Sequence, residues 1–252
     1  MSRLTGIRQL NETIIQCARC PRLVEFIQSV ALTRKREYQN WRYWGKPLPG
    51  WGDLRARLLV VGLAPAAHGA NRTGRMFTGD SSGDFLARVM HECGFAEQPF
   101  SRQCGDGQKL RGAYLTAVVR CAPPLNRPSA MEKRNCLPFL EEELRLLREV
   151  AVIICLGKFA WDGVWEALSN IGALLPRPRV SFGHGKECCL RHPLFDRELY
   201  LLSSYHPSRQ NTNTGKLTTE MFRQVFARAR EILDGGPHPS AIKMLPTAQL
   251  MD

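Results

Sequence analysis

The sequence has no long run of apolar residues. No N-terminal stretch joins a basic region to an extended apolar segment, and we therefore expect neither a secretory signal nor a membrane span. A chain lacking both is expected in the cytoplasm, a reducing compartment in which cysteines rarely form disulfides. Internal repeats and low-complexity stretches are absent as well. With 252 residues, 44% of them hydrophobic, the chain can form a globular domain with a substantial core.

Acidic residues are outnumbered by basic ones. The chain has 23 Asp and Glu against 35 Lys and Arg, which gives a net charge of +12 at pH 7. This excess favours a polyanionic partner, and the basic residues are spread along the chain instead of being gathered in a tail. Charge alone does not separate DNA from RNA or from a membrane surface, and it is also compatible with a plain solvated surface.

Four short apolar segments predict buried parallel strands. They are Leu58–Gly62, Tyr114–Val119, Val150–Leu156 and Leu199–Ser203, with stretches long enough for helical crossovers between them. This alternation predicts an α/β fold with an open sheet. In such a sheet ligands bind beyond the carboxyl ends of the strands, so the segments after these four strands are the candidates for a functional site.

Three helices can be predicted from periodicity and capping. Two run from about Leu217 to Leu233 and from about Ser82 to Cys93. The third begins at Ser129, which forms a capping box with Glu132, and we expect Pro138 to split or kink it. Residues 1–234 are expected to form a single domain, and residues 235–252, with several prolines, a loose extension.

The nine cysteines include only one C-x2-C pair in the N-terminal part of the chain. Cys17 and Cys20 form this pair, whereas Cys121 and Cys136 are separated by fourteen residues. Structural zinc sites usually have two close pairs, and one close pair with a split pair fits an iron–sulfur cubane at least as well. The spacing therefore predicts a metal centre and leaves the metal open, with unrelated buried cysteines as the alternative. The other five are interpreted as structural: Cys93, Cys104, Cys155, Cys188 and Cys189.

Two loops rich in small and polar residues follow the first and fourth predicted strands. The first begins Gly62-Leu63-Ala64-Pro65-Ala66 and ends Phe77-Thr78-Gly79-Asp80, and the second runs from His206 to Gly215. With the cysteine pattern, Cys121-Ala122-Pro123-Pro124 and Pro47–Asp53, these loops resemble the family 5 (B-type) uracil-DNA glycosylases of bacteria and archaea. The resemblance covers about residues 17–233.

The resemblance implies a three-layer α/β/α fold with a central four-stranded parallel sheet. It also implies a structural [4Fe–4S] cluster that ties in the N-terminal segment, held by Cys17, Cys20, Cys121 and Cys136. The expected partner is double-stranded DNA that contains uracil or other deaminated bases, with single-stranded DNA as a further substrate form. We expect a monomer.

Charge develops at two places when an N-glycosidic bond breaks, on the sugar and on the departing base. His206 is the candidate donor to the O2 oxygen of the base, which would stabilise the leaving anion. Asp80 is the candidate carboxylate that orients or deprotonates the attacking water, and it is also placed to cap the helix near Ser82. Asn126 can offer both a donor and an acceptor to a base edge or to water.

A base must leave the DNA stack to reach such a site. Phe77 is the candidate aromatic plate for the extruded base, with a core phenylalanine as the alternative, and Gly62, Ala64 and Ala66 would line the same pocket. The candidates for DNA contacts, which could also be ordinary solvated loop residues, lie in the two loops: Asn71, Arg72, Ser208, Arg209, Gln210 and Asn211.

The sequence departs from other uracil glycosylases in two respects, the activation of water and the selection of the base. The stretch Gly62–Ala66 has neither an acid nor an amide to position water, and the second strand ends without an asparagine to read the base. We therefore predict broad specificity that includes hypoxanthine and oxidised or alkylated pyrimidines. Neither loop contains a lysine before Lys216, which argues against strand cleavage through a Schiff base. Two alternatives remain: a cluster- or zinc-stapled binding module without catalysis, and a relative that forms a covalent complex with uracil DNA.

Overall fold

A six-stranded sheet forms the centre of the molecule. The computed structural model describes residues 3–192 and 195–236. Neighbouring strands follow the order β1-β3-β2-β4-β6-β5. The strands are β1 (Trp51–Gly52), β2 (Leu58–Gly62), β3 (Ala113–Ala117), β4 (Val152–Leu156), β5 (Glu187–His192) and β6 (Phe195–Ser204).

The four central strands are parallel and the two edge strands are antiparallel to their neighbours. β2 pairs in parallel with β3 and with β4, and β4 pairs in parallel with β6. The four predicted parallel strands are thus confirmed, whereas the predicted total of four is too small because β1 and β5 extend the sheet. Since β2, β3, β4 and β6 run the same way, their carboxyl ends meet at one edge.

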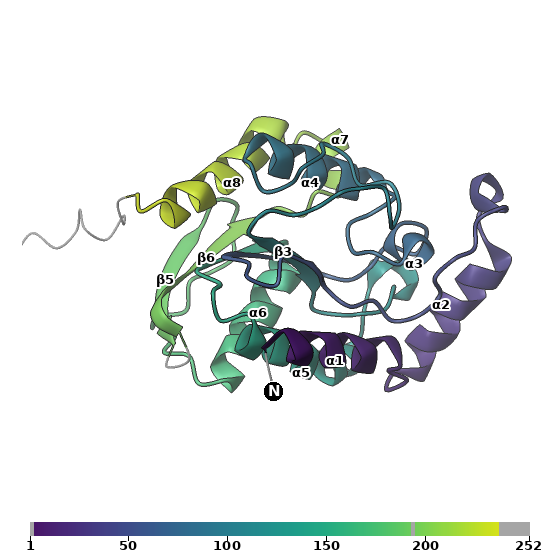
Figure 1. Cartoon of the computed structure of the whole chain (residues 1–252), viewed down its shortest axis with the longest axis horizontal. Helices are drawn as coiled ribbons and strands as arrows, with labels where there is room; N and C mark the ends of the chain where they lie inside the picture. Colours follow the sequence, from purple (N-terminus) through teal and green to yellow (C-terminus); the bar gives the residue numbers. More distant parts are fainter. Residues whose placement is uncertain (1–2, 193–194, 237–252) are drawn as a thin grey trace, which may run out of the picture.

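Helices cover both faces of the sheet, so the predicted three layers are confirmed (Figure 1). α4 and α8 lie on one face, α1, α5 and α6 on the other, and α2 and α3 at one end. The helices are α1 (Arg3–Ile15), α2 (Pro21–Thr33), α3 (Ala70–Thr73), α4 (Ser81–Glu92), α5 (Ala130–Leu146), α6 (Lys158–Asn170), α7 (Arg209–Asn213) and α8 (Thr219–Leu233). Two 3-10 turns, η1 (Arg36–Tyr38) and η2 (Pro124–Asn126), complete the described elements.

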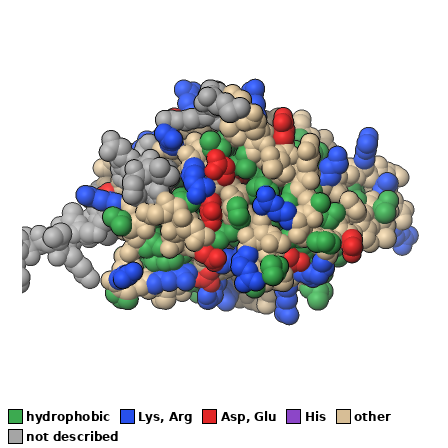
Figure 2. Space-filling view, turned by 90° about the horizontal axis from the view of Figure 1, so that it is seen from below, with side chains coloured by type: hydrophobic (Ala, Val, Ile, Leu, Met, Phe, Trp, Pro, Cys, Tyr) green, Lys and Arg blue, Asp and Glu red, His purple; other side chains and the backbone are tan. Residues whose placement is uncertain are grey.

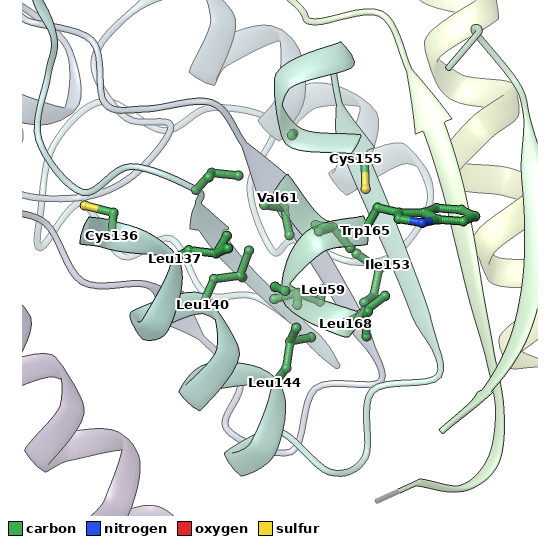
Figure 3. Packing of buried hydrophobic residues seen from close by; sticks show 14 of the residues in the cluster. Leu59, Val61, Cys136, Leu137, Leu140, Leu144, Ile153, Cys155, Trp165 and Leu168 are labelled. Carbon is green, nitrogen blue, oxygen red and sulfur yellow. The ribbon is translucent and has the colours of Figure 1, made fainter. Parts of the chain in front are cut away.

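The strands β2 and β4 are apolar throughout because both of their faces are buried. Alternate residues of a strand point to opposite faces. Leu58 and Val60 pack in the layer of α4 and α8, while Leu59 and Val61 pack towards α5 and α6. Figure 3 shows the second of these layers, where the leucines of α5 and the side chains Trp165 and Leu168 of α6 meet β2 and β4.

The helix α5 is one continuous helix with Pro138 inside it, so the predicted split at Pro138 is wrong, while a kink there stays a prediction. Its start is as predicted, because the Ser129 hydroxyl accepts from the Glu132 N–H and the Glu132 carboxylate accepts from the Ser129 N–H. A proline inside a helix removes one hydrogen bond. Burial of Phe139, Leu140 and their neighbours against the sheet offsets that loss.

The last described helix ends near the predicted domain boundary. α8 ends at Leu233, close to the predicted domain boundary, and residues 237–252 of the predicted extension lie outside the described residues. None of the helices in the described part of the chain combines the length and apolar character needed to cross a membrane.

Candidate active site

The two loops singled out in the sequence begin at the same edge of the sheet. The first follows β2 and the second follows β6, with β4 between them. Because neighbouring strands are about 4.8 Å apart, the ends of β2 and β6 are separated by about 10 Å, roughly the width of a nucleobase with its contacts. Gly157, directly after β4, has a φ of +93°, and a methyl group there would lie 3.3 Å from the His206 Cβ.

Asp80 caps α4 and also faces the first loop. Its Oδ1 accepts a hydrogen bond from the Gly83 N–H at 2.9 Å, which confirms the capping role. The other oxygen lies against Gly69, since a methyl group on Gly69 would overlap the carboxylate. Burial raises the pKa of Asp80, while hydrogen bonds from Gly83 and Ser82 act in the opposite direction. A carboxylate with a raised pKa is a stronger base than an exposed one.

Phe77 is held in an unusual backbone conformation at the end of the first loop. Its φ is +52°, and its ring rests on Gly62, where a methyl group would overlap the ring. The half-buried ring also borders a cavity of about 10 Å³ beside Trp51 and Leu86, which has room for one water at most. This cavity is too small for a base, so packing in the core accounts for one side of the ring, and the base-stacking role stays a prediction.

His206 is enclosed at the end of β6. Burial lowers the pKa of His206 to about 4, so the ring is neutral at pH 7. Its carbonyl oxygen accepts from the Asn211 amide at 2.8 Å, which fixes the turn into α7. The Ser208 hydroxyl accepts from the Asn211 N–H and caps α7. Ser208 and Asn211 therefore shape the second loop, whatever they contact in DNA.

Arg209 connects the second loop to the first. Its Nε donates to the Ser81 hydroxyl at 3.0 Å, directly beside Asp80. Gln210 is exposed on the same helix. An open hollow of about 430 Å³ adjoins this contact, lined by Ser81, Phe85, Arg88, Thr212, Leu217, Thr218 and Thr219.

The structure does not present Asn71 and Arg72 to DNA. Asn71 is fully buried, and its amide donates to the Ile27 and Ala67 carbonyls. Arg72 is 4% exposed, and its guanidinium donates to the carbonyls of His68 and Gly79. The predicted DNA contacts need exposed side chains, so here these two residues hold the first loop together instead.

The three remaining candidates are less directly connected to this edge. Ala64 is half-buried against the core, and the Ala66 carbonyl accepts from the Asn71 N–H at 3.0 Å. Asn126 is exposed in η2 with a φ of +55°. It follows Leu125, which has a φ of 53° and is 86% exposed.

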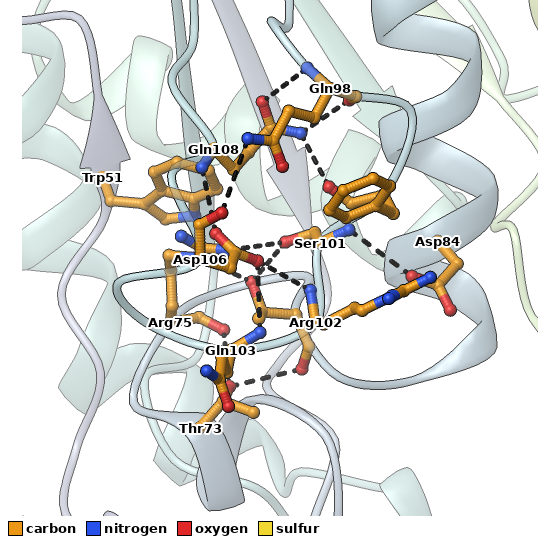
Figure 4. A network of polar contacts seen from close by, with 12 residues as sticks. Trp51, Thr73, Arg75, Asp84, Gln98, Ser101, Arg102, Gln103, Asp106 and Gln108 are labelled. Carbon is orange, nitrogen blue, oxygen red and sulfur yellow. Dashed lines mark hydrogen bonds and ion pairs between the residues drawn. The ribbon is translucent and has the colours of Figure 1, made fainter.

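A polar network that braces the first loop escaped sequence analysis (Figure 4). Arg75 forms an ion pair with Asp106 at 2.8 Å, and both side chains are 8% exposed. The Arg75 Nε also donates to the Thr78 hydroxyl, and the Gly79 N–H donates to the Ser101 carbonyl at 2.8 Å. These contacts hold the segment between Phe77 and Asp80. No local signal could reveal them, because Arg75 and Asp106 are 31 residues apart in irregular segments.

The four predicted cysteine ligands come from separate elements but lie near one another. Cys17 follows α1, Cys20 caps α2, Cys121 follows β3 and Cys136 lies in α5. Burial raises the pKa of Cys121, and the charges of Cys136, Cys17 and Cys20 raise it further. Burial likewise raises the pKa of Cys136 to about 11. Figure 3 shows the Cys136 sulfur pointing away from the leucines of its helix.

The arrangement of these thiols does not match a site for one ion. Across residues 3–192 and 195–236, no three His, Cys, Asp or Glu side chains are grouped closely enough to hold a single metal ion. Four thiolates around one zinc would be about 3.8 Å apart, given a Zn–S distance of about 2.3 Å. A cubane places four irons between its four thiolates, so the ligand sulfur atoms lie farther apart than around a single ion. Thiols that are too far apart for one ion are therefore compatible with a cluster.

The fold and this edge define an α/β protein whose candidate acid–base residues follow parallel strands. Residues 49–230 match the family model of the uracil DNA glycosylase superfamily, and the chain belongs to this superfamily. A type-5 uracil-DNA glycosylase of Thermus thermophilus is 47% identical over 88% of this chain and 95% of its own. Type-5 enzymes of Pyrobaculum aerophilum and Mycobacterium tuberculosis are 45% and 44% identical over 86% and 90% of this chain, and 88% and 82% of their own. A type-4 enzyme of Pyrobaculum aerophilum is 26% identical over 80% of this chain and 83% of its own.

Proposed function

We propose that this protein is a monofunctional DNA glycosylase of base excision repair that hydrolyses the N-glycosidic bond of uracil in DNA. Membership of the superfamily and the names of the type-5 relatives support this function. The structural observation that carries it is the position of Asp80 and His206. The two residues lie in the loops that follow β2 and β6, and these loops meet where Arg209 donates to Ser81, directly after Asp80. Burial raises the pKa of the Asp80 carboxyl and keeps the His206 imidazole neutral.

Asp80 acts on the sugar side of the bond. Its Oδ1 is occupied by the Gly83 N–H, which leaves Oδ2, beside Gly69, for water. The water oxygen attacks C1′ of the deoxyribose, and Asp80 orients the water and accepts its proton. The negative carboxylate also stabilises the oxocarbenium-like sugar as the bond lengthens.

His206 acts on the base side of the bond. When the C1′–N1 bond breaks, its electron pair leaves with uracil, and negative charge develops on the base oxygens. A neutral imidazole can donate one N–H hydrogen bond to O2 and so stabilise this anion. The departing uracil anion then takes a proton from solvent.

The residues around these two groups serve the extruded base and the DNA. Phe77 supplies the plate on which the base stacks, beside Gly62, Ala64 and Ala66. Arg209, Gln210 and Asn211 of the second loop face the duplex, and Asn126 contacts the base edge or water. The open hollow beside Ser81 and Arg88 gives the DNA backbone room next to α7.

We propose a substrate range that extends to hypoxanthine and to oxidised or alkylated pyrimidines. The polar side chains at the end of β3 support it, because they are already paired within the protein. The Thr116 hydroxyl donates to Glu143 at 2.8 Å, and Arg120 donates to the same carboxylate at 2.6 Å. All three are buried, so none of them can select a base by hydrogen bonding.

We also propose that Cys17, Cys20, Cys121 and Cys136 hold a [4Fe–4S] cluster. The mutual proximity of four thiols, three of them buried, supports this assignment over unrelated cysteines. When bound, the cluster supplies structural cross-linking of its four ligand segments rather than chemistry at the glycosidic bond. The protein's own residues carry every step of the reaction.

Uracil release from a labelled duplex, read as alkali-sensitive sites, tests the function. We expect single-turnover release by the native protein and a loss of about a hundredfold or more in Asp80→Asn. Gly69→Ala should cause a comparable loss, because the added methyl displaces the carboxylate without removing it. Glu92→Gln, which removes an exposed carboxylate at the other end of the same helix, is the control and should retain the native rate.

Two outcomes would overturn this assignment. If the native protein binds uracil duplex but creates no abasic sites over a range of salt concentrations, the chain is a binding module. If it forms a heat-resistant adduct with single-stranded uracil DNA, the product stays covalently attached and hydrolysis is not its reaction. Parallel duplexes with hypoxanthine test the wider substrate range.

A further inference from the structure

The segment 34–46 between α2 and β1, here called the strap, lies directly over the first loop. The Tyr43 hydroxyl is 3.1 Å from the His68 Nδ1. The N–H groups of Trp44 and Gly45 donate to the carbonyls of Arg72 and Asn71. In Figure 1 the chain after α2 forms the projection at the right of the molecule, on the side of α3. The strap is therefore joined to the loop that ends at Asp80.

Arg72 anchors the strap next to the site. Its guanidinium lies 3.9 Å from the centroid of the Tyr38 ring and 4.1 Å from that of Trp41. The same guanidinium donates to the Gly79 carbonyl at 2.7 Å, one residue before Asp80. The buried guanidinium of Arg72 thus makes cation–π contacts with two aromatic rings of the strap. These contacts hold the strap in place, which a purely solvated segment would not show.

The exposed side of the strap carries an excess of positive charge. It contains five basic residues and a single acid, Glu37, which pairs with Lys35 at 2.9 Å. Among the described residues, Arg36, Arg42 and Lys46 have no carboxylate partner, and all three are exposed. By contrast, cations on the face of α5 and α6 alternate with acids (Figure 2), as in the Lys133–Glu166 and Lys158–Asp162 pairs.

The strap and α7 approach each other near the start of α4. Arg209 of α7 donates to Ser81, and its charge also acts on Glu37 of the strap. Asp80 thus lies next to the contact of Arg209 with Ser81, and Arg72 joins the segment before it to the strap. A nucleic-acid backbone that crosses the site would contact both the strap and α7.

We propose that the strap binds the DNA backbone beside the extruded nucleotide, with Arg36, Arg42 and Lys46 contacting phosphates. The inference rests on the proposed function, and it adds a second phosphate-binding surface to the DNA site, near α7. Phosphate contacts set the register and the affinity, whereas base chemistry depends on Asp80 and His206. The strap should therefore determine the affinity for DNA and its salt dependence, and not the rate of uracil release from the bound complex.

The test compares two variants with equal charge loss. The strap variant is Arg36→Gln/Arg42→Gln/Lys46→Gln, which keeps Tyr38, Trp41 and Arg72 in place. The control is Arg8→Gln/Arg55→Gln/Arg57→Gln, whose exposed cations lie on α1 and before the amino end of β2. Fluorescence anisotropy with an undamaged labelled duplex gives Kd as a function of salt, and single-turnover uracil release gives the rate at saturating protein.

In the strap variant we expect the slope of log Kd against log salt to fall by about 2–3, with about a hundredfold weaker binding near 0.1 M salt. The saturated rate should stay native, and the control should keep the native slope. Equal slopes in the two variants would overturn the proposal. If the native protein releases no uracil but the strap variant loses duplex affinity, the proposed function fails and the strap inference stands.

Discussion

At the scale of single residues, burial keeps His206 in its neutral form. The pKa of His206 is lowered to about 4, so at pH 7 the ring acts as a hydrogen-bond donor and not as a cation. A cation would bind the DNA phosphates before and after the reaction alike. A neutral donor gains strength only as charge develops on the departing base, which favours the transition state over the bound substrate.

The pKa of His206 predicts a specific pH dependence of stability. An unfolded histidine takes up a proton below about pH 6.5, but the folded protein does so only below about pH 4. As the pH is lowered from about 6.5 to about 4, the free energy of unfolding should therefore fall by up to about 1.4 kcal/mol per pH unit. Urea denaturation of His206→Gln should lack this contribution, whereas His91→Gln, an exposed histidine of α4, should retain the native slope. Equal slopes in native protein and His206→Gln would show that the ring is not buried in its neutral form.

Sequence reasoning at this scale succeeded where function follows from a local position. Asp80 comes just before a predicted helix, and its capping role could be foreseen. The same reasoning failed for Asn71 and Arg72, because polar residues in a loop are expected at the surface. Here the loop is buried, and its backbone carbonyls need hydrogen-bond donors. Both side chains donate to such carbonyls and are not available to DNA.

At the scale of elements, the first loop is held from two sides. Arg75 and Asp106 brace it towards the segment 97–108, and Arg75 also stacks 4.5 Å from the ring centroid of Trp51. On the other side, Arg72 joins it to the strap. The left-handed conformation of Phe77 costs energy for a residue with a side chain, and contacts on both sides of the loop offset this cost.

Asp106→Asn tests the brace. The change leaves the Arg75 guanidinium buried without its charge partner, and the free energy of unfolding should fall by about 2–3 kcal/mol. The uracil release rate should fall as well, because the segment from Phe77 to Asp80 loses its support. Glu142→Gln removes a half-exposed pair with Arg145 and should cost less than about 0.5 kcal/mol. A native release rate in folded Asp106→Asn would show that the brace serves stability alone.

The elements that could be predicted are those with a strong pattern of their own. Both ends of β2 agree with the sequence prediction, because an apolar strand buried on both faces stands out from its neighbours. β1 consists of two residues and β5 reads Glu-Cys-Cys-Leu-Arg-His, so neither shows the pattern of a buried strand. These edge strands exist because they complete hydrogen bonds of β3 and β6, which is a property of the sheet and not of their own sequence.

At the scale of the whole molecule, the N-terminal segment packs on the body through apolar residues of α1 and α2, and its polar ties lie near the cysteines. Arg22 of α2 forms two hydrogen bonds with Glu132 of α5, but its side chain is half-exposed and such a pair contributes little. Arg19 lies 4.9 Å from the ring centroid of Phe139, and Asn135 donates to the Cys20 sulfur at 3.5 Å. A cluster at this junction would join α1, α2, β3 and α5, and with them the strap that follows α2.

The double variant Cys17→Ser/Cys20→Ser tests this tie. Removal of two ligands should abolish the visible absorption of a brown native protein. The thermal midpoint of unfolding should fall by more than about 5 °C, because metal binding contributes to folding where the ligands come from separate segments. Trypsin should then cleave at Arg19 and Arg22 before it cleaves the body. Cys104→Ser removes an exposed cysteine and should change neither colour nor stability. A colourless native protein with one zinc per chain would refute the cluster, and a double variant with native colour and midpoint would refute the ligand assignment.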